Sequence, residues 1–172
     1  MKRINDEKDT KIEHYQARNT ENELEYTNLL AVCYGNQSSP DSEVKGEKKR
    51  LTCDSMKGNQ VLHINPQNQE DMATIYYDNS GKIYSTNKEY QDDLQNILNL
   101  NDSYGYLIEN RKAVIDVVMK ELRTARNSQE AKTILVRFKR MVSNWSYGDK
   151  YMEYVGVLRW YVDKQLRKHG MS

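Results

Sequence analysis

Three short motifs lie between residues 11 and 65, reading KIEH at 11–14, YTNLLAVC at 26–33 and TCDSMKGN at 52–59. The first places an acidic residue beside a histidine, and the second places an asparagine before an apolar run that ends in a cysteine. The third contains a second cysteine, which is followed directly by Asp54 and, three residues later, by Lys57. Nearly all of the unusual local chemistry of the chain falls in this segment.

An acidic residue beside a histidine is a weak signal on its own, because a single histidine such as His14 is more often an ordinary surface residue. The spacing strengthens it, since Asn28, the two cysteines and Asp54 follow in order. Carboxylates, imidazoles and thiolates are the groups that bind metal ions and transfer protons in hydrolytic enzymes. We therefore expect the chemistry of the protein in this segment.

The C-terminal third is predicted to be helical. Apolar residues recur at three- and four-residue steps over residues 106–126, 129–142 and about 150–168, which is typical of helices with one buried face. Asp102 or Ser103 can cap the first helix and Ser128 the second. These apolar stripes favour a packed core over a cofactor site.

The middle of the chain has a different pattern. Two runs of β-branched and aromatic residues at 75–77 and 82–84 flank Asp78-Asn79-Ser80-Gly81, which predicts a β-hairpin. A short helix is expected over residues 89–98. Residues 37–50 hold a single aliphatic side chain among Ser, Pro, Gly and charged residues, and this composition indicates a long polar loop.

The composition restricts the class of protein. The chain has 172 residues, 37% of them hydrophobic and 30% charged, with a mean hydropathy of -0.95. This is one domain's worth of chain, or a small domain with a helical extension. The longest uncharged apolar stretch, 28–34, is too short to cross a bilayer, and the charged start lacks the apolar core of a secretion signal. We expect a cytoplasmic protein without a membrane partner.

The near-neutral net charge of +1 conceals an uneven distribution. Residues 1–60 carry ten basic and eleven acidic residues, residues 61–103 carry two and seven, and residues 104–172 carry fourteen and seven. A basic C-terminal third is suited to bind a polyanion or an acidic partner surface. The alternative is that these charges are the solvated faces of helices.

The order of the motifs resembles the HNH nucleases of the ββα-metal class, and in particular the branch associated with retrons and Septu-type anti-phage defence. The resemblance is carried by six segments: KIEHYQARN (11–19), YTNLLAVCYGN (26–36), LTCDSMKGN (51–59), INP (64–66), GKIYS (81–85) and LNLNDSYGYLIENRKAV (98–114). It implies an α+β protein with an HNH core over residues 1–66, a hairpin and connecting helix over 67–103, and a basic helical bundle over 104–172.

The resemblance also implies roles for individual residues. His14 would be the general base that deprotonates the attacking water, and Glu13 and Asp54 would hold a catalytic Mg²⁺ or Mn²⁺ through their oxygens. Many HNH enzymes have histidine or asparagine where Asp54 stands, so Asn59 is the substitute candidate for the third ligand. Asn28 would position the loop that orients His14. Lys57 would contact a phosphate oxygen.

The two cysteines resemble half of a structural zinc site. Such sites are closed tetrahedra with four ligands, so Cys33 and Cys53 cannot complete one alone. In the resembling family a Cys-x-x-Cys pair lies upstream, and residues 1–4 look like the segment that follows it, so we expect the natural protein to begin earlier. In the alternative interpretation the short form is natural, the two cysteines are ordinary buried thiols, and the nuclease fold is loosened or inactive.

The function implied by the resemblance is metal-dependent hydrolysis of DNA phosphodiester bonds, as the effector of a bacterial anti-phage system with an ATPase partner. The chain has no Gly-x-x-x-x-Gly-Lys-Ser/Thr motif, so ATP hydrolysis would belong to that partner. The alternative is a catalytically inactive HNH-like module that binds a partner ATPase or nucleic acid.

Overall fold

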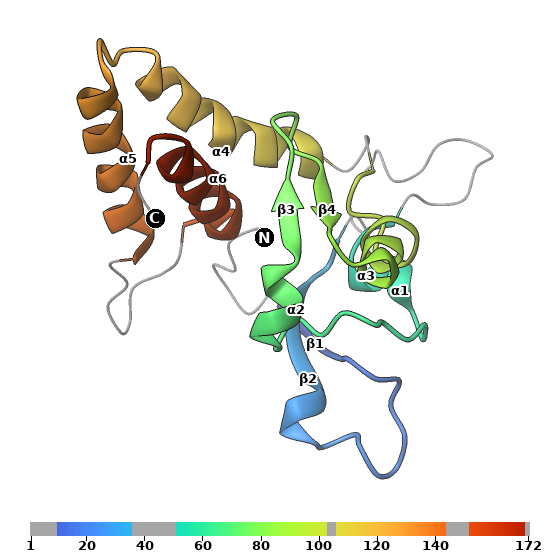
Figure 1. Cartoon of the computed structure of the whole chain (residues 1–172). Helices are drawn as coiled ribbons and strands as arrows, with labels where there is room; N and C mark the ends of the chain where they lie inside the picture. Colours follow the sequence, from blue (N-terminus) through green and yellow to red (C-terminus); the bar gives the residue numbers. More distant parts are fainter. Residues whose placement is uncertain (1–9, 36–50, 103–105, 144–151, 171–172) are drawn as a thin grey trace, which may run out of the picture. The chain divides into compact units, whose positions relative to one another are not determined.

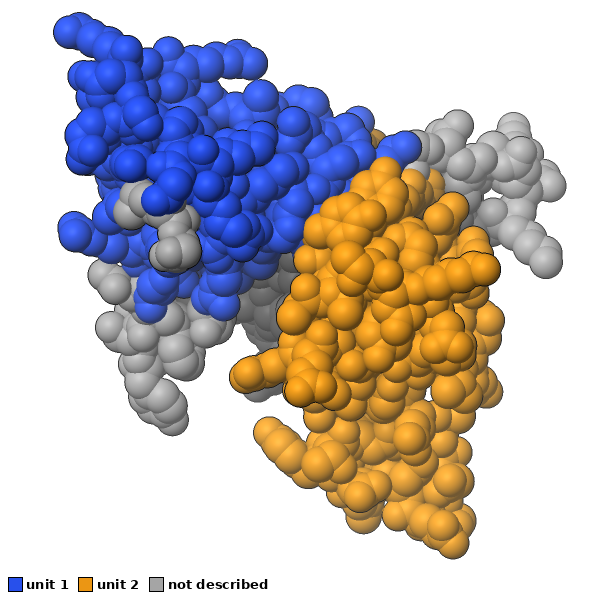
Figure 2. Space-filling view, in the orientation of Figure 1, with its two compact units in different colours: residues 1–3, 77–82, 109–172 blue, residues 4–76, 83–108 orange. Residues whose placement is uncertain are grey.

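The computed structural model describes residues 10–35, 51–102, 106–143 and 152–170, and its contacts divide the chain into two units (Figures 1 and 2). Unit 1 contains the described residues within 77–82 and 109–170, and unit 2 contains those within 10–76 and 83–108. The structure is 50% helical and 12% strand, with two small sheets, as expected for an α+β protein. The turn of the predicted hairpin, within 77–82, belongs to unit 1 with the C-terminal helices. The strand that follows the turn belongs to unit 2 with the N-terminal motifs.

The N-terminal motifs of unit 2 form a pair of strands followed by a single helical turn. Strand β1 (Thr10–His14) pairs antiparallel with β2 (Leu29–Cys33), which is entered through the 3-10 turn η2 (Tyr26–Asn28). In this register Thr10 lies opposite Cys33, and His14 opposite Leu29. Helix α1 (Asp54–Lys57) follows. The polar loop predicted over residues 37–50 lies outside the described residues.

A glycine allows the end of β2 to approach the segment before α1. Gly35 has a φ of +57°, and a Cβ atom there would lie 2.5 Å from the carbonyl oxygen of Thr52. A side chain at this position would therefore meet backbone that cannot move aside cheaply. This contact brings the third motif to the end of the second.

Residues 69–97 contain the predicted hairpin and short helices, and they belong to unit 2 except for 77–82, which belong to unit 1. The elements are α2 (Gln69–Ala73), β3 (Ile75–Tyr77), β4 (Ile83–Ser85), α3 (Lys88–Asp92) and the π-helical turn η4 (Asp93–Ile97). The hairpin is confirmed by the pairing of β3 with β4. The helix expected over residues 89–98 is present as α3, which runs directly into the π turn.

Unit 1 is built on three helices: α4 (Leu107–Leu122), α5 (Ser128–Ser143) and α6 (Val155–Lys168). The predicted apolar stripes form one core, whose members below 1% exposure are Ile115, Val118, Leu135 and Val162. The predicted caps are wrong in two cases. Asp102 lies five residues before α4, and the amide of Glu130 bonds to Asn127 Oδ1 at 2.9 Å, so Asn127 rather than Ser128 caps α5. Ser103 lies outside the described residues.

Candidate functional site

Two acidic residues that the sequence separates by 41 positions converge in unit 2. Glu13 comes from β1, and Asp54 is the first residue of α1. Both carboxylates reach the ammonium group of Lys11, with Nζ–O distances of 2.8 Å to Glu13 Oε1 and 2.7 Å to Asp54 Oδ2. The three side chains are largely shielded, with exposed fractions of 20% for Lys11, 34% for Glu13 and 12% for Asp54. Two carboxylates from different elements therefore surround one cationic group.

Local strand geometry explains how this arrangement forms. Side chains two positions apart on a strand point to the same face, so Lys11 and Glu13 project together from β1. Burial by itself would lower the pKa of Lys11, but its hydrogen bonds to Asp54 and Glu13 outweigh this and raise it. The point at which the carboxylates meet thus favours positive charge. Oxygen donors around such a point fit a hard divalent cation such as Mg²⁺ or Mn²⁺.

His14 is held by the loop that follows β1. Its Nε2 lies 3.0 Å from the carbonyl oxygen of Glu23. Because a carbonyl oxygen only accepts hydrogen bonds, Nε2 carries the proton in the neutral ring, and Nδ1 remains the basic nitrogen. His14 is one position from Glu13 on the strand, so its side chain leaves the opposite face. No hydrogen bond or ion pair within the described residues joins it to Glu13 or Asp54.

Asn28 fastens the residues directly after His14. Its Oδ1 accepts the amide of Gln16 at 2.7 Å, and its Nδ2 donates to the carbonyl oxygens of Gln16 at 3.2 Å and Asn22 at 3.4 Å. The backbone carbonyl of Asn28 also accepts the amide of Tyr15 at 2.9 Å. The side chain is 5% exposed. These bonds fix where β1 ends and therefore where His14 stands.

Lys57 and Asn59 differ in their surroundings. Lys57 is 5% exposed, and its ammonium group donates to the carbonyl oxygens of His14 and Gly58, both at 3.3 Å. It therefore ties α1 to the end of β1 and does not project into solvent. Asn59 follows α1 and is exposed. Neither side chain forms a hydrogen bond or ion pair with Glu13 or Asp54 in the described part of the chain.

The two cysteines are neighbours. A hydrogen bond to the Cys33 thiol, together with burial, raises the pKa of Cys53 well above its ordinary value. The backbone of Cys53 has φ 57° and ψ -140°, a conformation that costs a residue other than glycine on the order of 1–3 kcal/mol. Its amide is anchored to the carbonyl oxygen of Leu98 at 2.8 Å. The structure thus places the thiols side by side, directly before Asp54.

Two residues in unit 2 have contacts that the sequence analysis did not predict. One is Lys11, whose signal was available in its i, i+2 spacing to Glu13. The other is His63, which belongs to none of the three motifs and lies in a bend. The buried carboxylate of Asp93 lies 3.0 Å from His63 Nδ1 and also accepts the amides of His63 and Ile64, at 2.6 and 2.8 Å. Nothing local to residue 63 indicates a partner thirty residues away.

The described residues contain no cluster of three or more histidine, cysteine or acidic side chains that could hold a metal ion. Within the same residues, none of the helices combines the length and apolar character needed to span a membrane. Comparisons with protein-family models, curated proteins and solved structures found no match to this chain.

Proposed function

We propose that this chain is a metal-dependent endonuclease of the HNH type that hydrolyses phosphodiester bonds in DNA. The observation that carries the proposal is the convergence of Glu13, from β1, and Asp54, from α1, on one positively charged point. Carboxylates that lie close together repel one another, and a cation between them relieves this repulsion. A divalent ion bound there would supply Lewis-acid stabilisation of the charge that develops on the scissile phosphate.

In the proposed reaction His14 acts as the general base, which requires its ring to reach the attacking water from the face of β1 opposite Glu13. Its Nε2–H is committed to the Glu23 carbonyl oxygen, which leaves Nδ1 to take a proton from water. Asn28 acts as a positioning residue, because its bonds to Gln16 define the backbone immediately after the histidine. Lys57 acts in the same way through the carbonyl oxygen of His14. The burial of Lys57 supports this positioning role over the expected contact with phosphate.

The proposal includes a structural zinc. Cys33 and Cys53, whose thiols are neighbours, would lose their protons on binding the ion and supply two of its four ligands. Since Cys53 immediately precedes Asp54, a metal bound to it would fix the start of α1 and, with it, one carboxylate of the catalytic cation site. The strained backbone of Cys53 is consistent with a position that a bound ion stabilises.

The proposed context is the cytoplasm of a bacterium, as the effector of an anti-phage system that works with a separate ATPase. This rests on the six segments that resemble the retron- and Septu-associated HNH proteins. It explains why the chain combines nuclease-like motifs with a basic helical region and lacks an ATP-binding loop.

The experiment is a plasmid-nicking assay with the purified chain, with Mg²⁺ or Mn²⁺ and with EDTA. His14→Ala should abolish metal-dependent nicking, typically by two or more orders of magnitude for loss of a general base, while circular dichroism shows a retained fold. His169→Ala is the matched control, since His169 is at the end of α6 in unit 1, and it should cut at the wild-type rate. Cleavage that survives both His14→Ala and EDTA would contradict the mechanism.

One observation favours the alternative of a catalytically inactive HNH-like module that binds a partner ATPase or nucleic acid. The Lys11 ammonium group already occupies the point between the two carboxylates and offsets one of their two negative charges. An inactive module requires that the wild-type chain bind no Mn²⁺ at millimolar concentration and that His14→Ala change no measured activity. Isothermal titration calorimetry with Mn²⁺, run beside the nicking assay, separates the two proposals.

A further inference from the structure

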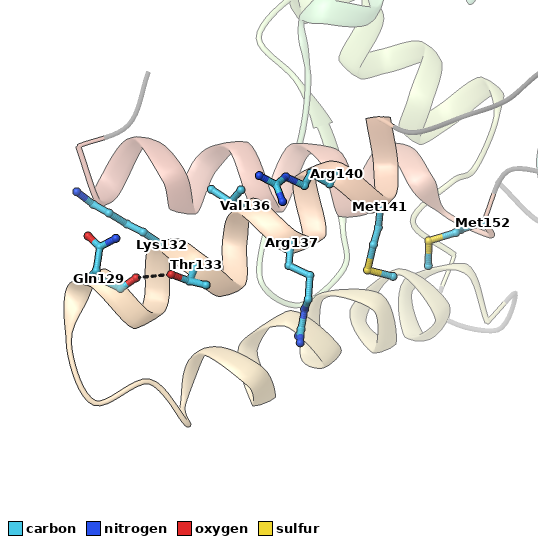
Figure 3. Close-up of a pocket in the computed structure, with 8 residues that line it drawn as sticks. All are labelled: Gln129, Lys132, Thr133, Val136, Arg137, Arg140, Met141 and Met152. Atoms are coloured by element: carbon cyan, nitrogen blue, oxygen red, sulfur yellow. Dashed lines mark hydrogen bonds between the residues drawn. The ribbon is translucent and has the colours of Figure 1, made fainter.

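A groove of about 920 Å³ runs along the face of α5 that is turned away from the core of unit 1 (Figure 3). The lining residues on α5 extend from Gln129 to Met141, and Met152, ahead of α6, closes one end. The twelve residue-to-residue steps from Gln129 to Met141 rise about 18 Å, which is the length of about three helical turns. The groove therefore has the dimensions of a short helix rather than of a small molecule.

The lining combines exposed apolar side chains with positive charge. Met141 is 51% exposed and Met152 is 45% exposed, and Val136 lies between them and the start of the helix. Methionine is flexible and polarisable, and it is a residue type used by surfaces that receive partner helices. Exposed side chains of this kind gathered in one groove indicate a contact surface rather than scattered surface residues.

The cations in the groove are not neutralised by its own lining. The basic residues are Lys132, Arg137 and Arg140, and none of the eight described lining residues is acidic. Arg137 is held in place, because its guanidinium pairs with Glu121 at 2.7 Å and lies over the ring of Phe138. No ion pair to Lys132 or Arg140 occurs in the described residues. The groove therefore presents an apolar floor with two cations available to a ligand.

We infer that this groove binds an acidic amphipathic helix of a partner protein. Apolar residues at i, i+3 or i+4 and i+7 of that helix would cover Met141 and Met152, and carboxylates on its flank would pair with Lys132 and Arg140. A nucleic acid would satisfy the cations through its phosphates but would leave the methionines without an apolar partner. A second copy of α5 would bring the same positive charges and be repelled. This inference does not depend on nuclease activity.

The test uses a yeast-displayed library of helical peptides about 18 residues long, with randomised side chains, sorted against the full chain. Peptides that bind should be enriched in Asp or Glu on one side of an apolar stripe. Their affinity, measured by fluorescence anisotropy, should fall at least about tenfold with Arg140→Glu and with Met141→Gln. Arg167→Glu, an exposed site on α6 with the same change of charge, should alter the affinity less than about twofold.

Three results would overturn the inference. The first is enrichment of peptides without acidic residues or without an apolar stripe, or no enrichment at all. The second is unchanged affinity in both groove variants while circular dichroism shows that they are folded. The third is displacement of the selected peptides by duplex DNA, together with weaker DNA binding by the Met141→Gln variant. This result would make the groove a nucleic-acid surface. A loss of nicking with intact peptide binding would affect the proposed nuclease only.

Discussion

Lys11 holds together two carboxylates that would otherwise repel each other. Its ammonium group lies 2.8 Å from Glu13 and 2.7 Å from Asp54, at the point where the proposed divalent cation would bind. A lysine in this place would compete with the ion, because its ammonium group must move away from the carboxylates before the ion can bind between them. The same side chain therefore stabilises the protein without metal and would weaken its affinity for the proposed ion.

Lys11→Met should tighten the binding of Mn²⁺ about tenfold, or about 1.4 kcal/mol. This is well below the roughly 4 kcal/mol of a charge pair at 4 Å near a protein surface, because the displaced lysine regains solvent. Isothermal titration calorimetry measures the change directly. Lys82→Met removes an exposed lysine from the hairpin turn and should leave the affinity unchanged. Equal or weaker binding by Lys11→Met would show that Lys11 does not compete with the ion.

The pair of His63 and Asp93 predicts a dependence of stability on pH. The hydrogen bond to Asp93 and the negative charge of that carboxylate raise the pKa of His63. A histidine whose pKa is higher in the folded than in the unfolded protein stabilises the fold while it is protonated. This contribution is fully present below the unfolded pKa of about 6.5 and is lost as the pH rises through the folded pKa.

Urea unfolding between about pH 5.5 and 8.5 measures this effect. The free energy of unfolding of the wild type should decrease as the pH rises across the raised pKa of His63. His63→Gln keeps a polar side chain without a charge in this range, and its profile should be flatter over the same interval. Parallel profiles for the two proteins would assign the pH dependence to other groups.

Among the secondary-structure elements, α5 offers a direct test of its N-terminal cap. Asn127 Oδ1 accepts the Glu130 amide at 2.9 Å, and Ser128 is the first helical residue. Asn127→Ala should therefore lower the free energy of unfolding by about 1 kcal/mol. Ser128→Ala should cost less than half of that, because the hydrogen bond that its hydroxyl makes within the described residues is an exposed one, to His169 at 3.3 Å. The reverse order in urea denaturation would restore the cap expected from the sequence.

The helices show which features of an element can be predicted from a sequence. Apolar spacing located α4, α5 and α6 because each buries one face in a common core. Their ends were less predictable, since Asn127 and Ser128 are both good caps and only the geometry of one hydrogen bond separates them. The π turn η4 begins at Asp93, whose carboxylate binds the amides of His63 and Ile64. Periodicity does not report contacts thirty residues apart.

The candidate site, like the helices, could be predicted from the sequence only in part. Alternation along β1 could have placed Lys11 beside Glu13, but the approach of Asp54 depends on contacts between separate motifs. The burial of Lys57 was not predictable, because lysine is usually exposed and its acceptor is a backbone carbonyl of His14. Residue types identified which side chains could act, whereas tertiary packing determined which of them meet.

The two units of the molecule are stabilised by different kinds of interaction. Unit 1 has an extended apolar core contributed by all three helices. In unit 2 the buried hydrophobic residues among those described are Leu62, Ile64, Ile83 and Leu94, and they are accompanied by buried polar side chains, including Asn28, Lys57 and Asp93. Hydrogen bonds with defined geometry thus carry much of the organisation of unit 2. A bound metal ion would add to the smaller core, which is where the proposed site lies.

This difference predicts that the units lose protection from hydrogen exchange separately. Leu135 is fully buried in unit 1, and Leu135→Ala should cost about 2–5 kcal/mol. Mass spectrometry should show faster exchange in peptides from α4, α5 and α6, with β1 and β2 unchanged, whereas Thr133→Ala, at an exposed position on the same helix, should change neither. Mn²⁺ should slow exchange around β1 and α1 in the wild type and in Leu135→Ala alike. Equal loss of protection in both units of Leu135→Ala would mean that they unfold as one, and the metal site would then depend on the helical core.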